Sequence, residues 1–200
     1  KLSEESKKNV TLMLHTSPED KAGCNLFEIG YELGILETIA FSTEKVETEH
    51  INILHNISDV CLNISFNEGF GLTTLESMMA GTPIIASKTG GLYRQVVDFR
   101  DNSENGIALD IKNKSLTGSQ NVPYIFEDYV DTQDVASALM KMYKMSKEEQ
   151  SKLSKKVESY SNFAFDYENT INLWDKSINK TIEEFKCQKL KTNVEVITLK

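Results

Sequence analysis

The chain has 200 residues, 40% of them hydrophobic, and its 22 basic and 30 acidic side chains give it a formal net charge of −8. This apolar share is enough for a folded core, which excludes general disorder. The acidic balance, without a dense stripe of Lys and Arg, argues against nucleic acid and anionic lipid surfaces as partners.

Short apolar runs alternate with helical spacings along the first part of the chain. Residues 25–33 place apolar side chains three and four positions apart, and Gly34 follows, which predicts a helix with a glycine stop. The expected elements are a strand at 10–15, this helix, a strand at 38–42, a helix at 47–58, a strand at 59–65, a helix at 73–80, a strand at 83–87, a helix at 92–97 and a strand at 106–110. This alternation, with strands apolar on both faces, predicts an α/β fold with a Rossmann-like doubly wound parallel sheet. Ligands bind such sheets where strand carboxyl ends meet helix amino ends.

Residues 111–130 interrupt this alternation with polar and turn-forming residues, so we expect a surface insertion that is either functional or merely tolerated. Helices are expected from residue 132 onwards, at 148–160 and at 167–185, with Tyr167 and Trp174 packed on the core. We assign residues 1–188 to one domain. The tail 189–200 contains a strand-like run but receives no assignment.

Three cysteines, Cys24, Cys61 and Cys187, are widely separated and odd in number. This pattern predicts reduced thiols rather than a disulfide framework or a zinc site. No stretch approaches the ~20 apolar residues of a membrane span, and the acidic amino end does not fit a signal peptide. The expected location is therefore cytoplasmic, and the absence of an initiator Met suggests a fragment of a longer protein.

The loop around Gly69 and Gly71 joins a predicted strand to a predicted helix. Two missing Cβ atoms would let a ligand approach the unpaired amides of the first helical turn, where the helix dipole favours phosphate. The alternative is purely structural, because Thr73-Thr74-Leu75-Glu76 also fits a capping box in which Glu76 bonds back to the helix start. Local chemistry leaves both interpretations open.

The run from Asn67 to Ser87, N-E-G-F-G-L-T-T-L-E-S-M-M-A-G-T-P-I-I-A-S, followed by Gly90-Gly91, resembles the donor-site signature of retaining GT-B glycosyltransferases. That family includes glycogen synthases, sucrose synthases and bacterial mannosyl- and glucosyltransferases. Ser58-Asp59-Val60, Gly106-Ile107 and Asn162–Phe165 also follow the family pattern. The resemblance implies the carboxyl-terminal, donor-binding half of a GT-B fold, ending in helices.

The resemblance also implies roles for individual residues. Glu68 is similar to the acid beside the donor sugar, the expected catalytic residue, and Glu76 to the acid that binds the ribose hydroxyls. If Glu76 binds ribose, it cannot also cap its own helix. The further residues expected at the nucleotide sugar are Gly69, Phe70, Gly71, Leu72 and Thr73 at the diphosphate or sugar, Ser42 and Thr43 near the base, and Gly90 and Gly91, with Thr89, at the next strand exit.

Two departures from the family pattern stand out. Arg94 occupies the position where the family usually carries a glutamate, and no counterpart of the family's Arg–Lys pair, which neutralises the diphosphate, follows the first strand. The amino-terminal acceptor domain is also missing, so turnover by the isolated fragment is not expected.

We therefore expect a hexosyltransferase fragment that uses a UDP-, GDP- or ADP-linked sugar and a glycan or other hydroxyl acceptor. No cofactor is expected, and no metal, because the chain has no Asp-x-Asp motif. The alternative is a non-catalytic nucleotide-sugar-binding or interaction module of the same fold, and a sugar-nucleotide epimerase is a third candidate.

Overall fold

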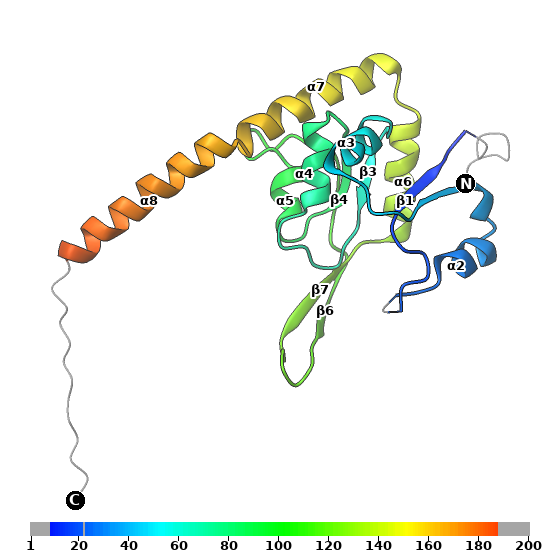
Figure 1. The fold of residues 1–200 in the computed structure, drawn as a ribbon, viewed down its shortest axis with the longest axis horizontal. Helices are drawn as coiled ribbons and strands as arrows, with labels where there is room; N and C mark the ends of the chain where they lie inside the picture. The colour runs from blue at the N-terminus through cyan, green and yellow to red at the C-terminus, as the bar shows by residue number, and fades with distance from the viewer. Residues whose placement is uncertain (1–8, 22, 188–200) are drawn as a thin grey trace, which may run out of the picture. The chain divides into compact units, whose positions relative to one another are not determined.

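The computed structural model describes residues 9–21 and 23–187 of the chain (Figure 1). The tail from residue 188 onwards, including the strand-like run, lies outside the described residues. Contacts within the chain separate it into two compact units, Lys1–Ile51 and Asn52–Lys200. Each unit is described by itself below.

The first unit contains a parallel strand pair, β1 (Leu12–His15) and β2 (Ile39–Ser42), with His15 opposite Ser42. Helix α2 (Leu26–Glu32) and the short 3-10 helix η1 (Leu36–Thr38) connect the two strands. The Asn25 side chain caps α2 by accepting hydrogen bonds from the N–H groups of Phe27 and Glu28, at 3.0 and 3.2 Å. The predicted stop at Gly34 is confirmed by its left-handed backbone, with φ of 64°. Helix α3 (Thr48–Asn56) leads into the second unit.

The second unit is built on a parallel sheet in the order β3-β4-β5. These strands are Cys61–Asn63, Ile84–Ser87 and Gly106–Leu109, and they are joined through helices α4 (Leu72–Met79) and α5 (Leu92–Val96). All four residues of the central strand β4 are buried. The predicted strand–helix alternation and the parallel pairing are confirmed.

The buried side chains form two clusters, one on each face of β4, because successive strand residues point to opposite faces. Ile84 and Ala86 belong to the first cluster and Ile85 to the second. The first cluster also contains Met78, Leu92, Val96, Val97, Val157 and Tyr160, and the second contains Leu109, Ala138 and Met142. Helices therefore cover both faces of the sheet, as a parallel sheet requires.

Three helices follow the sheet: α6 (Thr132–Tyr143), α7 (Lys147–Ala164) and α8 (Tyr167–Cys187). A capping box between Ser146 and Glu149 starts α7. The described side chains of α8 are all exposed, with Trp174 at 65% and Tyr167 at 74% exposure. The expectation that these two side chains pack on the core is therefore wrong, although the apolar spacing of the helix is real. None of the helices in the described ranges is both long and apolar enough to cross a membrane.

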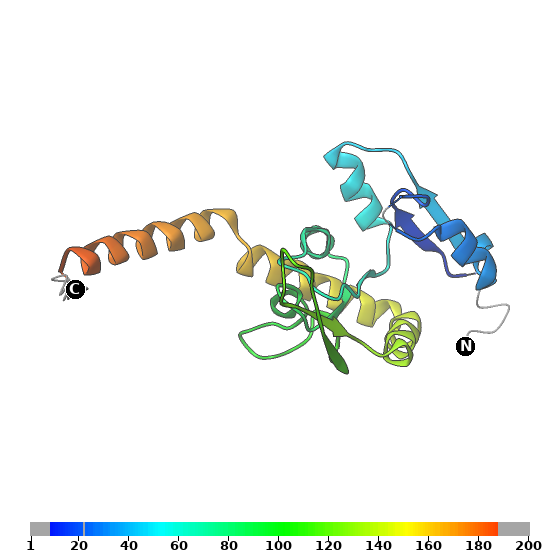
Figure 2. The same ribbon diagram turned by 90° about the horizontal axis from the view of Figure 1, so that it is seen from below.

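The surface insertion at 111–130 forms an antiparallel hairpin of β6 (Asn113–Thr117) and β7 (Ile125–Tyr129), visible in Figure 1 and Figure 2. Its register places Lys114 opposite Asp128 and Leu116 opposite Phe126. The base of the hairpin is fastened to the loop after β3, because the Asp128 N–H donates to the carbonyl of Phe66 at 2.8 Å. The rings of Phe66 and Tyr129 also lie 4.4 Å apart.

Candidate functional site at the carboxyl ends of the central strands

The loop between β3 and α4 ends in a glycine that starts the helix. Gly71 is the N-cap of α4 and has a left-handed backbone, with φ of 90°. A Cβ at this position would lie 2.6 Å from both Leu92 Cδ2 and Thr74 Oγ1, so the turn accepts no larger residue without movement. The glycine therefore allows α4 to begin directly against α5.

The turn between β4 and α5 packs on this same loop. The Gly91 N–H donates to the Glu68 carbonyl at 3.0 Å. A Cβ on Gly90 would lie 1.9 Å from the Glu68 carbonyl oxygen, and one on Gly91 would lie 2.5 Å from Phe70 Cα. The two glycine motifs, separate in the sequence, thus form one surface at the carboxyl ends of β3 and β4.

Glu68 and Glu76 stand on either side of the start of α4. Glu68 Oε1 accepts a hydrogen bond from the Phe70 N–H at 3.3 Å. Glu76 is half-exposed, at 53%, and its Oε2 lies 3.7 Å from Nε2 of His55, a side chain that is only 12% exposed. The capping box is not formed, because the N-cap is Gly71 and makes no side-chain cap bond. The carboxylate of Glu76 is therefore not used to start its helix.

Gln95 is a residue of the site that the sequence reasoning missed. It is fully buried, and its Nε2 donates to the carbonyls of Phe70, at 2.7 Å, and Gly71, at 3.1 Å. Its Oε1 accepts from the Thr74 hydroxyl. In the sequence, its signal is a glutamine one turn after the double glycine.

The hairpin contributes Asp128 to the edge of the site. The Thr89 hydroxyl donates to Asp128 Oδ2 at 2.7 Å, and Lys114 Nζ lies 3.2 Å from Oδ1. The hydrogen bond from Thr89, and then the neighbouring Lys114, lower the pKa of Asp128 below its usual value. Thr89 directly precedes Gly90, so the insertion is bonded to the turn that packs on Glu68.

The remaining predicted residues occupy two places. Leu72 and Thr73 are exposed on the first turn of α4, beside Gly69 and Phe70, which are also exposed. Ser42 and Thr43 belong to the first unit, where Ser42 Oγ lies 2.9 Å from His15 Nδ1.

Residues 25–159, more than half of the chain, match the family model described as "Glycosyl transferases group 1". The chain belongs to the group 1 glycosyltransferase family. A trehalose synthase of Pyrococcus horikoshii is 36% identical over 114 residues, which cover 54% of this chain and 25% of the relative. A D-inositol 3-phosphate glycosyltransferase of Corynebacterium diphtheriae is 34% identical over 83 residues, covering 42% of this chain and 18% of the relative. The chain thus aligns with a quarter or less of the length of these two relatives.

Solved structures agree with the family at the level of the fold. Sucrose-phosphate synthase from Thermosynechococcus elongatus matches 87% of this chain and 38% of its own, with a TM-score of 0.62 and 21% identity. HepE of Anabaena, solved in complex with UDP and glucose, matches 88% of this chain and 41% of its own, with a TM-score of 0.60 and 18% identity. The predicted GT-B fold is confirmed.

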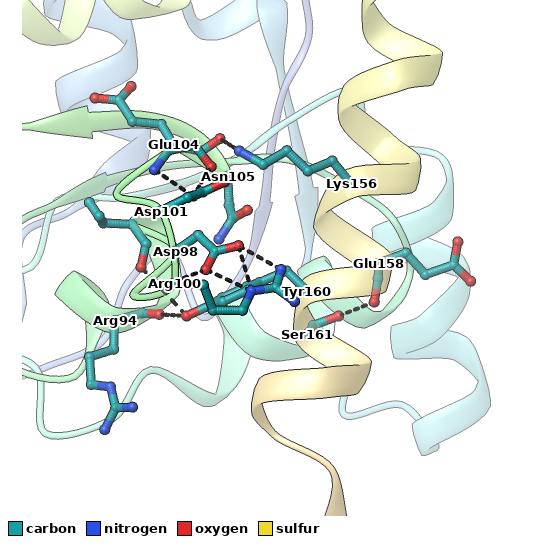
Figure 3. Close-up of polar contacts among 12 residues, drawn as sticks. Arg94, Asp98, Arg100, Asp101, Glu104, Asn105, Lys156, Glu158, Tyr160 and Ser161 are labelled. Atoms are coloured by element: carbon teal, nitrogen blue, oxygen red, sulfur yellow. Dashed lines mark hydrogen bonds and ion pairs between the residues drawn. The ribbon is translucent and has the colours of Figure 1, made fainter.

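Arg94, the departure from the family's glutamate, is an exposed residue of α5. Its carbonyl accepts a hydrogen bond from the Tyr160 hydroxyl of α7 (Figure 3). Its guanidinium lies 4.9 Å from the centre of the Phe99 ring. The position is thus tied to α7 through the backbone, while the charged group stays on the surface.

An ion pair between a buried carboxylate and an exposed guanidinium lies next to this contact. Asp98 is 1% exposed, and Arg100 binds it through Nε and Nη2 (Figure 3). The hydrogen bonds from Arg100 lower the pKa of Asp98. Lys156 of α7 donates to the Glu104 carbonyl at 2.6 Å, so α7 is fastened on both sides of the α5–β5 connection.

Proposed function

We propose that the chain is the donor-binding part of an enzyme that transfers a hexose from a nucleotide diphosphate sugar to a glycan or other hydroxyl acceptor, with retention. The observation that carries this proposal is the packing of the Gly90-Gly91 turn on Glu68, Gly69 and Phe70. It joins the two motifs of the resemblance into one surface at the carboxyl end of a parallel sheet, the usual ligand position in such folds.

The chemistry assigned to each group follows from its charge and from whether it already serves the helix start. The N–H groups of the loop and the first turn of α4 are neutral donors suited to a diphosphate leaving group. Glu68 lies at the loop and stabilises positive charge that develops at the anomeric carbon. Glu76, which caps nothing, accepts the paired hydroxyls of the ribose. An amino-terminal domain outside these 200 residues binds the acceptor.

A second function, a binding module without turnover, is favoured by one observation. Lys88 lies next to the Thr89-Gly90-Gly91 turn in the sequence and is paired with Asp110 at 2.7 Å. Lys114 is linked to the same turn through Asp128, with which it is paired at 3.2 Å. The hydrogen bond from Lys88 to Asp110 raises the pKa of Lys88, which keeps this pair charged. Neither lysine replaces the family's Arg–Lys pair without giving up its carboxylate.

Calorimetric titration of the chain with UDP, GDP and ADP tests donor binding. We expect one of the three to bind, and Glu76→Gln to weaken that binding by about tenfold, since one hydrogen-bonded charge is lost. Glu148→Gln is the matched control, because Glu148 is an exposed acid in the first turn of another helix, α7. Equal affinities of the two variants would remove Glu76 from the ribose site, and no binding of any nucleotide would refute the proposal.

Turnover separates the enzyme from the binding module. Release of nucleoside diphosphate from UDP-, GDP- or ADP-sugars by the full-length protein is expected, and its loss in Glu68→Gln would support the enzyme. Donor binding without any release would favour the binding module instead.

A further inference from the structure

Gln95 forms a clamp between α5 and the glycine loop. Its amide nitrogen is shared by the carbonyls of Phe70 and Gly71, at 2.7 and 3.1 Å, while its amide oxygen accepts from Thr74. We infer that Gln95 is a positioning residue for the nucleotide diphosphate: it holds two carbonyls inward and thereby directs the N–H groups of Gly71 and Leu72 outward. This inference rests on the proposed function.

The direction of the N–H groups follows from peptide geometry. In a trans peptide the carbonyl of one residue and the N–H of the next lie in one plane and point in opposite directions. The peptide bonds here are trans. Holding the Phe70 carbonyl toward the buried Gln95 therefore turns the Gly71 N–H away from the interior. The Gly71 carbonyl is held by Gln95 together with the Leu75 N–H of α4, at 3.1 Å each, and this does the same for the Leu72 N–H. Within the residues that the structure describes, neither N–H has a hydrogen-bond acceptor in the protein.

A glutamine side chain suits this task better than its closest isosteres. It has two N–H bonds for two carbonyls and one oxygen for a hydroxyl, and all three are used in a fully buried position. A carboxylate would place an acceptor against two other acceptors, and a methionine would leave the Phe70 carbonyl unpaired, while the Gly71 carbonyl would keep only its donors from α4. The amide orientation is settled by the partners, because only the nitrogen can face two carbonyls.

The backbone of Gln95 is held in turn by Asn105. Asn105, directly before β5, donates from Nδ2 to the Gln95 carbonyl at 2.9 Å, and its N–H donates to the Val96 carbonyl at 2.8 Å. Asn105 is also fully buried. The loop is therefore connected through Gln95 to the sheet rather than to solvent, which keeps its N–H groups in one orientation before a ligand arrives.

If Gln95 positions the N–H groups that bind phosphate, its loss should change the affinity for phosphate-containing ligands selectively, which a general loss of stability would not do. The clamp acts on the diphosphate only, since the base and ribose are assigned to other residues. Weakening the clamp should lower the affinity for a nucleoside diphosphate and leave the affinity for the corresponding nucleoside unchanged.

The test compares Gln95→Met and Gln95→Glu with Val157→Ala, which removes buried methyl groups of α7 from the core. Nuclear magnetic resonance titrations, which detect weak binding, follow UDP, GDP and ADP and the nucleosides uridine, guanosine and adenosine. We expect both Gln95 variants to bind the diphosphate at least about tenfold more weakly, with nucleoside affinity within twofold of wild type, and Val157→Ala to bind both ligands as wild type.

The outcomes distinguish this inference from the proposed function. If the wild-type chain binds a diphosphate and both Gln95 variants bind it with the same affinity, the positioning role of Gln95 is overturned while the proposed function stands. An equal loss of diphosphate and nucleoside affinity also overturns it, since the role of Gln95 would then be structural. A wild-type chain that binds none of the three diphosphates refutes the proposed function and the clamp with it.

Discussion

Gly90 is the position where a single methyl group should separate the two glycine turns. In Gly90→Ala the new Cβ would lie 1.9 Å from the Glu68 carbonyl oxygen. Since carbon and carbonyl oxygen approach each other to about 3.3 Å, the two turns would have to move apart by about 1.4 Å. That movement breaks the hydrogen bond from the Gly91 N–H to Glu68.

The free energy of unfolding should fall for two reasons. Gly90 has a φ of 44°, a left-handed backbone that costs an alanine about 1–2 kcal/mol. The broken hydrogen bond adds about 1 kcal/mol. We therefore expect Gly90→Ala to lose about 2–3 kcal/mol, the sum of these two terms.

Gly69→Ala is the matched control on the same surface, because a Cβ on Gly69 meets nothing within 4 Å. Its stability should stay within about 0.5 kcal/mol of wild type. Urea unfolding, followed by circular dichroism, measures both variants, and their stabilities are compared when the dependence of the unfolding free energy on urea concentration has the same slope. If Gly90→Ala were as stable as Gly69→Ala, the described contact between the two turns would be wrong.

Two further predictions concern carboxylates. The hydrogen bond from Thr89, and then Lys114, lower the pKa of Asp128, so the charged carboxylate stabilises the fold above the unfolded pKa of 3.8, and this stabilisation disappears as the pH falls through the folded pKa. The urea midpoint of wild type should therefore exceed that of Asp128→Asn at neutral pH, and the difference should shrink below pH 3.8. A difference that stays constant with pH would exclude the charge of Asp128 as its cause. Asp98→Asn should cost about 1–3 kcal/mol in the same assay, because it weakens the hydrogen bonds from Arg100 to a buried carboxylate. Asp134→Asn, which weakens the exposed pair with Lys112, should cost less than Asp98→Asn, and equal losses would contradict the role of burial.

The local order of strands and helices was predictable because each element has its own apolar period and its own stop. Gly34 and the buried run 84–87 are clear cases, since a glycine stop and a strand apolar on both faces require no knowledge of distant residues. The packing of α8 was not predictable in this way. Its apolar spacing is the same whether a partner covers the helix or solvent does, and Trp174 is exposed in the structure.

The candidate site was predictable as a set of motifs but not as a set of contacts. Glu68 and the Gly90-Gly91 turn were named from the resemblance, whereas their mutual contact depends on how β3 and β4 pair. His55, Gln95 and Asp128 were missed because each comes from a different segment and acts through polar contacts with residues far away in the sequence. A single sequence has no periodic signal for such side chains.

The position of Glu76 changes the balance between the two interpretations of the loop. A capping box would have used this carboxylate to satisfy the start of α4, but Gly71 fills the N-cap position with a backbone that needs no side chain. The start of the helix therefore keeps free N–H donors, while two carboxylates, Glu68 and Glu76, stand nearby. An anion bound there by charge attraction would be opposed by both acids. On the proposed function this conflict disappears if phosphates are held by neutral N–H groups and the carboxylates are directed to hydroxyls. The Gln95 clamp then strengthens donor binding, because it fixes the direction of the neutral N–H groups that face the phosphates.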